Sequence, residues 1–167
     1  MSQLAVYGIA IVFSFIAWGL VTAHYIWPAL RERSRADALR PLLLLHCFRF
    51  IGLAFVVPGV VSPDLPAGFA SPAAYGDLIA AVFAMLAVAA GLHTKLGIAL
   101  AWVFSVWGTG DLLHAFYQGN RVGLVPGQLG AAYFIVTVIV PLLFITHGLV
   151  FRLLLRDDVV GAAPGRS

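Results

Sequence analysis

The sequence is poor in charged residues and in cysteine. Asp, Glu, Lys and Arg together make up 10% of its 167 residues, whereas an ordinary soluble domain has about a quarter. The single cysteine, Cys47, excludes an internal disulfide and a metal site built from several thiolates. The chain contains no His-Glu-x-x-His, Cys-x-x-Cys, Gly-x-Ser-x-Gly or glycine-rich phosphate motif. The sequence therefore gives no support to the hydrolase, redox-thiol and nucleotide-binding classes that use these motifs.

Hydrophobic residues account for 62% of the chain, and the mean hydropathy is +0.99. Because a membrane-spanning helix needs about 20 mainly apolar residues, we predict an all-α integral membrane protein, a bundle of five transmembrane helices. The expected spans are residues 4–30, 42–61, 74–92, 98–117 and 129–155. They make up a single domain over residues 1–156, and residues 157–167 are expected to form a short, disordered cytoplasmic tail.

The positively charged residues indicate how these helices are oriented. Arg31, Arg33, Arg35 and Arg40 follow the first span, and Lys95 lies between the third and fourth spans. Lys and Arg gather on the cytoplasmic side of membrane proteins, so we predict an N-terminus outside and a C-terminus in the cytoplasm. Because the Lys and Arg residues cluster in a few loops and do not form a basic face, nucleic-acid binding is not expected. The bias toward Ala, Gly, Leu, Val and Arg is typical of a GC-rich bacterial genome, which suggests a bacterial inner membrane.

Two charged residues within the expected spans are the main candidates for function. Burying a charge at the centre of a membrane costs at least about 2.5 to 3.5 kcal/mol, so such residues face the protein interior, a partner or a water-filled cavity. Arg49 lies about nine positions into the second span, and Asp111 lies near the outer end of the fourth. Their expected depths differ by less than about 10 Å. We therefore predict an ion pair between Arg49 and Asp111, which either serves a ligand site or only holds two helices in register.

Asp111 also has a possible partner on its own helix. His114 follows three positions later, so the two side chains are expected to share one face and to form an acid–base pair with a catalytic role. Asp77 of the third span and Trp107 of the fourth would join Arg49 in binding the ligand. Apolar walls with a few polar groups suit a membrane-dissolved molecule that is lipid-like or isoprenoid-like. Its partners would then be the lipid bilayer and this small molecule.

Two alternatives remain open from the sequence. His24, His46 and His147 lie at similar distances from the cytoplasmic ends of three spans, as ligands of a metal or of a b-type haem would. The protein would then be a small membrane redox component. Alternatively, the chain is an accessory subunit of a membrane complex or a homo-oligomer, whose small-residue faces contact a partner helix. In that case the buried polar residues only pair helices with one another.

Overall fold

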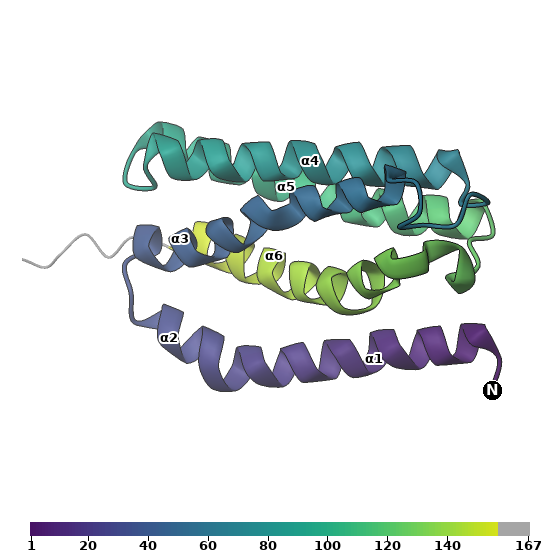
Figure 1. The fold of residues 1–167 in the computed structure, drawn as a ribbon. Helices are drawn as coiled ribbons and strands as arrows, with labels where there is room; N and C mark the ends of the chain where they lie inside the picture. The colour runs from purple at the N-terminus through teal and green to yellow at the C-terminus, as the bar shows by residue number, and fades with distance from the viewer. Residues whose placement is uncertain (157–167) are drawn as a thin grey trace, which may run out of the picture.

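The computed structural model describes residues 1–156, and the tail expected over residues 157–167 lies outside them. The regular elements in the described part of the chain are all helical. Five helical segments are long and apolar enough to cross a membrane: Gln3–Arg31, Arg35–Val56, Ala67–Ala90, Lys95–Arg121 and Ile135–Leu154. The predicted all-helical class and the five long apolar helices are therefore confirmed (Figure 1).

Three of these five segments change helix type along their length. In chain order the elements are α1 (Gln3–Val21), η1 (Thr22–Ile26), α2 (Trp27–Arg31), α3 (Arg35–His46), η2 (Cys47–Val56), α4 (Ala67–Ala90), α5 (Lys95–Arg121), η3 (Pro126–Ala132), η4 (Ile135–Ile139) and α6 (Val140–Leu154). The elements η1 and η4 are wide π-helical turns, whereas η2 and η3 are 3₁₀ helices. Non-standard turns within long helices often mark functional positions.

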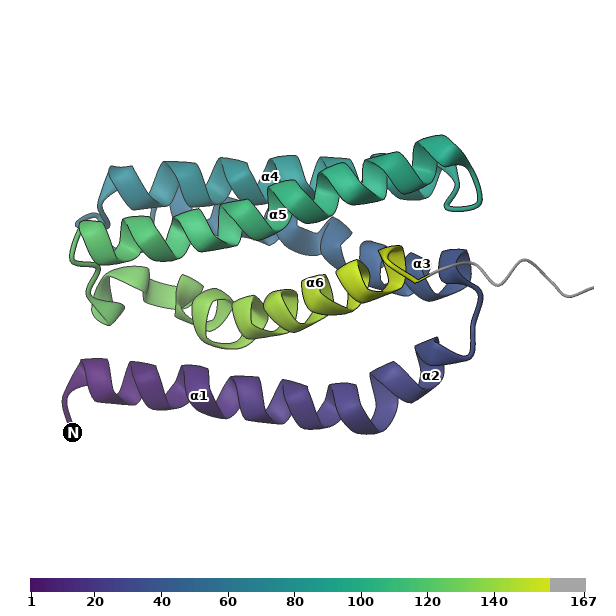
Figure 2. The ribbon, with the colours of Figure 1, turned by 180° about the vertical axis from the view of Figure 1, so that it is seen from behind.

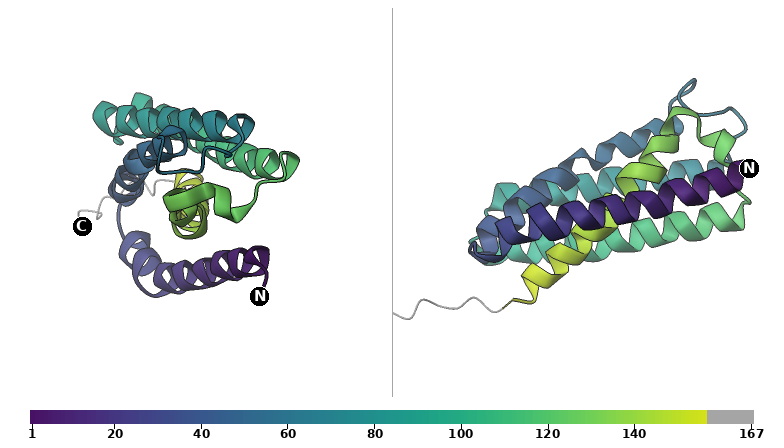
Figure 3. Two further views of the ribbon diagram at one scale, coloured as in Figure 1. Left: turned by 45° about the vertical axis from the view of Figure 1, so that its right-hand side comes forward. Right: turned by 90° about the horizontal axis from the view of Figure 1, so that it is seen from below.

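The helices run side by side, with α1 at the edge of the bundle. Figures 1 and 2 show α4 and α5 along one side and α1 along the opposite side, with α3, η2 and α6 between them. Seen from below, in the right-hand view of Figure 3, α1 crosses in front of α6. Only 6% of the most apolar stretch of the first segment is buried, against 33% to 44% in the other four. The first segment is therefore attached to the bundle along one narrow side.

The closest packing occurs around α4. Its inward face consists of small side chains, and Ala74, Ala80, Ala81, Ala84 and Ala87 have no exposed surface. This small-residue face is therefore completely buried. Because alanine lets two backbones approach closely, both α5 and η2 pack against α4 along much of its length. This close approach brings polar side chains from three elements to one point.

Two helices begin seven residues earlier than the sequence predicts. The second span starts at Arg35 instead of residue 42, because Ser34 accepts a hydrogen bond from the backbone N–H of Asp37 and caps the helix. The third starts at Ala67 instead of residue 74. Pro41 and Pro72 lie inside these helices, within their first two turns, where a proline removes one intrahelical hydrogen bond. Each helix tolerates that loss.

The two π-helical turns share one sequence feature. Each is followed by a single residue and then by a proline, Pro28 after η1 and Pro141 after η4. A proline ring clashes with the carbonyl four residues before it, and a wider turn relieves that clash. In η4 the carbonyl of Val138 accepts hydrogen bonds from Trp18 Nε1, at 3.0 Å, and from Ser14 Oγ, at 3.4 Å. These side-chain bonds attach α1 to the segment that leads into α6.

Candidate functional site

Arg49 lies at the centre of the bundle and is 1% exposed. It belongs to η2, where residues three apart lie on one face because a 3₁₀ helix has three residues per turn. That face consists of Arg49, Gly52 and Phe55, which are the three buried residues of η2, and it packs against α4. The tight turn therefore directs the guanidinium into the space between α4, α5 and α6.

All three nitrogens of the Arg49 guanidinium have hydrogen-bond partners. Nε and Nη2 both reach Asp77 Oδ1 at 2.7 Å, and Nη2 also reaches Asp111 Oδ2 at 2.7 Å. Nη1 donates to the carbonyl of Gly108 at 3.2 Å and lies 3.1 Å from His147 Nε2. A buried guanidinium is tolerated when its charge is paired and its donors are satisfied, and both conditions hold here. The predicted Arg49–Asp111 ion pair is confirmed.

The two aspartates come from neighbouring helices, Asp77 from the middle of α4 and Asp111 from α5. Each side chain is 9% exposed. Each carboxylate gives one oxygen to Arg49, and the other oxygen, Asp77 Oδ2 or Asp111 Oδ1, has no hydrogen-bond partner within residues 1–156. Two carboxylates therefore face a single guanidinium, and each has acceptor capacity left over.

His147 completes the contacts of Arg49 from α6. Arginine carries only donors and keeps its proton in proteins, so His147 Nε2 must accept the hydrogen bond. His147 is therefore neutral in this arrangement, with its proton on Nδ1. The ring of His46 packs against it, with 4.3 Å between ring centroids, and Phe104 lies 4.9 Å from both rings. His46 Nε2 lies 3.0 Å from the hydroxyl of Thr146.

Three glycines provide the space for this cluster of Arg49, Asp77, Asp111 and His147, which we call the Arg49 cluster. A Cβ atom on Gly52 would overlap the Asp77 carboxylate, and one on Gly76 would overlap the Asp111 carboxylate. A Cβ atom on Gly108 would lie 2.6 Å from Arg49 Nη1 and 2.7 Å from His147 Cε1. Real Cβ atoms essentially never approach other atoms so closely. The site therefore depends on glycine at one position in each of η2, α4 and α5.

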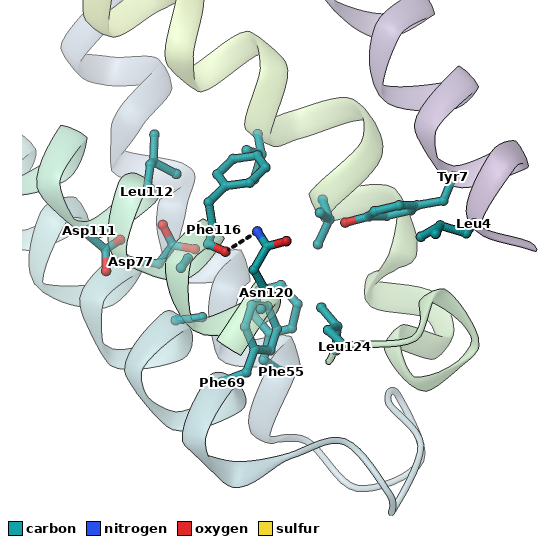
Figure 4. A pocket seen from close by; sticks show the side chains of 15 residues that line it. Leu4, Tyr7, Phe55, Phe69, Asp77, Asp111, Leu112, Phe116, Asn120 and Leu124 are labelled. Atoms are coloured by element: carbon teal, nitrogen blue, oxygen red, sulfur yellow. Dashed lines mark hydrogen bonds between the residues drawn. The ribbon is translucent and has the colours of Figure 1, made fainter. Parts of the chain in front are cut away.

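The two aspartates line a cavity of about 300 Å³. Figure 4 shows Asp77 and Asp111 on one side of it and Tyr7 and Leu4 of α1 on the other. The other walls come from η2, α4, α5, the loop after α5, η4 and α6; their residues are Phe55, Phe69, Ala73, Leu112, Ala115, Phe116, Gly119, Asn120, Leu124, Val136 and Val140. The volume is at the lower end of the range of small-molecule sites, about 300 to 1,000 Å³. Its lining combines apolar walls with a few polar groups, a combination that is common in small-molecule sites.

The structure brings together three of the residues that the sequence proposes for the ligand-binding or catalytic site: Arg49, Asp77 and Asp111. His114 is exposed and makes no hydrogen bond with Asp111. Trp107 is 44% exposed, and its Nε1 donates to the carbonyl of Gly76 at 3.4 Å, so it packs over α4 outside the cavity.

The three histidines of the metal or haem alternative are also separated. His46 and His147 are buried in ring contact, whereas His24 is exposed on η1. Within residues 1–156, no group of three or more His, Cys, Asp or Glu side chains has the geometry of a metal site. The sequence did not suggest that His147 would bind Arg49, or that Gly52, Gly76 and Gly108 would provide space for the cluster. A glycine in a span is explained equally well by ordinary helix packing.

Residues 6–155 match the family described as Domain of unknown function (DUF8737). The chain belongs to this family. The match covers all five long apolar segments of this DUF8737 member, apart from the first few residues of α1, and it includes every residue of the Arg49 cluster. Comparisons with curated proteins and with solved structures found no match.

Proposed function

We propose that the protein spans a bacterial inner membrane five times, with its N-terminus outside and its C-terminus in the cytoplasm. One end of the bundle gathers positive charge, which supports this orientation. Arg156 donates hydrogen bonds to the carbonyls of Arg31 and Arg33, and Arg35 donates to the carbonyl of Arg156. The end that holds Tyr7 and the cavity has a single Lys or Arg residue, Arg121, which is the last residue of α5.

We further propose that the cavity binds a small, membrane-dissolved amphiphile, with the polar head against Asp77 and Asp111. The observation that carries this proposal is that two buried carboxylates, each with one oxygen that has no hydrogen-bond partner within residues 1–156, belong to residues that line a largely apolar cavity. A purely structural ion pair between helices has no need of a cavity beside it. Apolar walls bind the hydrocarbon part of a ligand, and a few placed polar groups orient its head.

The position of α1 supports access from the lipid phase. Leu4 and Tyr7 of α1 form one wall of the cavity, and α1 is the least buried of the long helices. Elements with few buried contacts open at low free-energy cost. A hydrocarbon molecule could therefore reach the cavity from the side by a small displacement of α1, without crossing an aqueous loop.

Filling the cavity tests the proposal. Ala115→Trp places an indole in the cavity wall on α5, and Val106→Trp places the same indole on the exposed face of the same helix. The three proteins are purified in mild detergent from the native host, and their bound small molecules are identified by native mass spectrometry and lipid extraction. We expect the same bound molecule with the wild type and Val106→Trp, and its loss with Ala115→Trp. Equal amounts on all three proteins, or no bound molecule on any of them, would contradict the proposal.

A further inference from the structure

When both of its carboxyl groups are ionised, the Arg49 cluster carries one negative charge that Arg49 does not balance. Arg49 contributes one positive charge, and Asp77 and Asp111 contribute one negative charge each. His147 faces the same point from α6 and is neutral there because its Nε2 accepts from Arg49. Tyr7 of α1 faces the cavity from the opposite wall as a neutral phenol, and no Lys or Arg lines the cavity. A positive charge from outside the chain would restore the balance.

The carboxyl groups of Asp77 and Asp111 are the groups of the cavity lining that could bind such a charge. Asp77 Oδ2 and Asp111 Oδ1 belong to side chains that are more than nine-tenths buried, and both residues line the cavity. Both oxygens can only accept hydrogen bonds when the carboxyl groups are ionised. A positively charged group with several N–H donors can donate to more than one carboxylate oxygen, whereas a hydroxyl has one proton to donate. An anionic head would meet two carboxylates and is excluded by repulsion.

The aromatic residues of the cavity favour the same ligand. Tyr7, Phe55, Phe69 and Phe116 are among its lining residues, and they come from four different elements. The face of an aromatic ring attracts a cation, with an energy of about 0.5 to 2 kcal/mol that rises as water is excluded. The same rings bind a hydrocarbon chain, so they serve both parts of an aliphatic amine.

We propose that the ligand of this cavity is a cationic amphiphile, a protonated amine on a hydrocarbon chain, with its ammonium bound between Asp77 and Asp111. This inference rests on the proposed ligand-binding function and narrows it to one chemical class. In this arrangement Arg49 holds the two carboxylates in place and neutralises the charge of one of them. The second negative charge is then left for the ligand.

Three probes that share one hydrocarbon chain test the head group: octylamine, octanol and octanoate. Each is titrated calorimetrically at neutral pH into the protein in lipid nanodiscs, with empty nanodiscs subtracted to remove partitioning into lipid. We expect octylamine to bind at least tenfold more tightly than octanol, and octanoate to show no binding. Equal affinities for octylamine and octanol would overturn the assignment of a cationic ligand and leave the cavity proposal in place. Absence of binding by all three would overturn both.

Removing the charge of Asp111 sharpens the result. Asp111→Asn keeps an oxygen that can accept from Arg49, and the cluster becomes neutral. We expect the preference for octylamine over octanol to fall to about twofold or less, while octanol binds as before. Asp64→Asn, which removes the same charge from an exposed loop, is the matched control and should keep the preference. A preference that survives Asp111→Asn would contradict the assignment, and if this variant does not fold, the wild-type comparison of the three probes decides alone.

Discussion

The helix α4 is closely packed against its neighbours, whereas α1 is attached to the bundle by a few side-chain contacts. Around α4, alanines and glycines bring η2 and α5 so close that a buried arginine reaches acceptors on three elements. Along α1, aromatic and hydroxyl side chains reach across to a single carbonyl in η4, and the helix remains largely exposed. Close packing therefore coincides with buried charge, and loose packing coincides with the wall through which a ligand would enter. Substitutions on the two sides should differ accordingly.

The largest effect is expected from removing Arg49. Arg49→Met leaves Asp77 and Asp111 buried without a counter-charge, and breaking a buried ion pair costs about 3 to 5 kcal/mol. We expect a loss of this size in the free energy of unfolding, measured by denaturant titration in detergent micelles. Arg121→Met removes a positive charge from the exposed end of α5 and should change the stability by less than about 0.5 kcal/mol. Similar losses in both variants would show that the Arg49 cluster does not stabilise the bundle.

An intermediate effect is expected at the glycines. Gly76→Ala forces the Asp111 carboxylate to move, and overpacking of this kind costs about 1 to 3 kcal/mol. Gly110 of α5 and Gly19 of α1 have open space where a Cβ would be. Their alanine variants should therefore have an unchanged free energy of unfolding, or one that is higher by up to about 1 kcal/mol because alanine has the higher helix propensity. Thermal unfolding of the three variants measures the difference. A Gly76→Ala protein as stable as Gly110→Ala would mean that this close approach is absent.

The smallest effect is expected where α1 meets η4. Trp18→Phe keeps most of the aromatic ring and removes the hydrogen bond from Nε1 to the carbonyl of Val138. The loss in stability should be about 0.5 to 1.5 kcal/mol. It should be confined to α1, because this helix is attached to the bundle along one side only. Hydrogen exchange followed by mass spectrometry should show faster exchange in α1 with little change in α4. Equal increases in both helices would contradict the view of α1 as a separate, loosely held wall.

The sequence predicts the helices of this fold better than it predicts the site. Long apolar runs define the five segments, but the starts of the second and third were placed too late, because these helices begin with polar or turn-forming residues before the apolar run. The depth of Arg49 and Asp111 in their spans was enough to predict their pairing. Depth follows from counting residues at a fixed rise per residue, which a sequence supplies directly.

Rotation of a helix about its own axis was much harder to predict. His114 lies three residues after Asp111, yet it is exposed while the Asp111 carboxylate turns inward. Residues three apart on a helix differ by about 60° in direction, which is enough to place one inside and the other outside. The 3₁₀ turn of η2 and the bond from Arg49 to His147 have no sequence signal either, because both depend on how four helices pack together.

A double-mutant cycle between Arg49 and Asp111 tests the central claim most directly. The claim is that these two residues act as one buried unit at the cavity. The unfolding free energies of Arg49→Met, Asp111→Leu and the double variant are compared with that of the wild type. We expect the double variant to be more stable than the sum of the single losses predicts, with a coupling energy above about 1 kcal/mol. Losses that add to within about 0.5 kcal/mol would show that the two residues are independent, and would contradict the account.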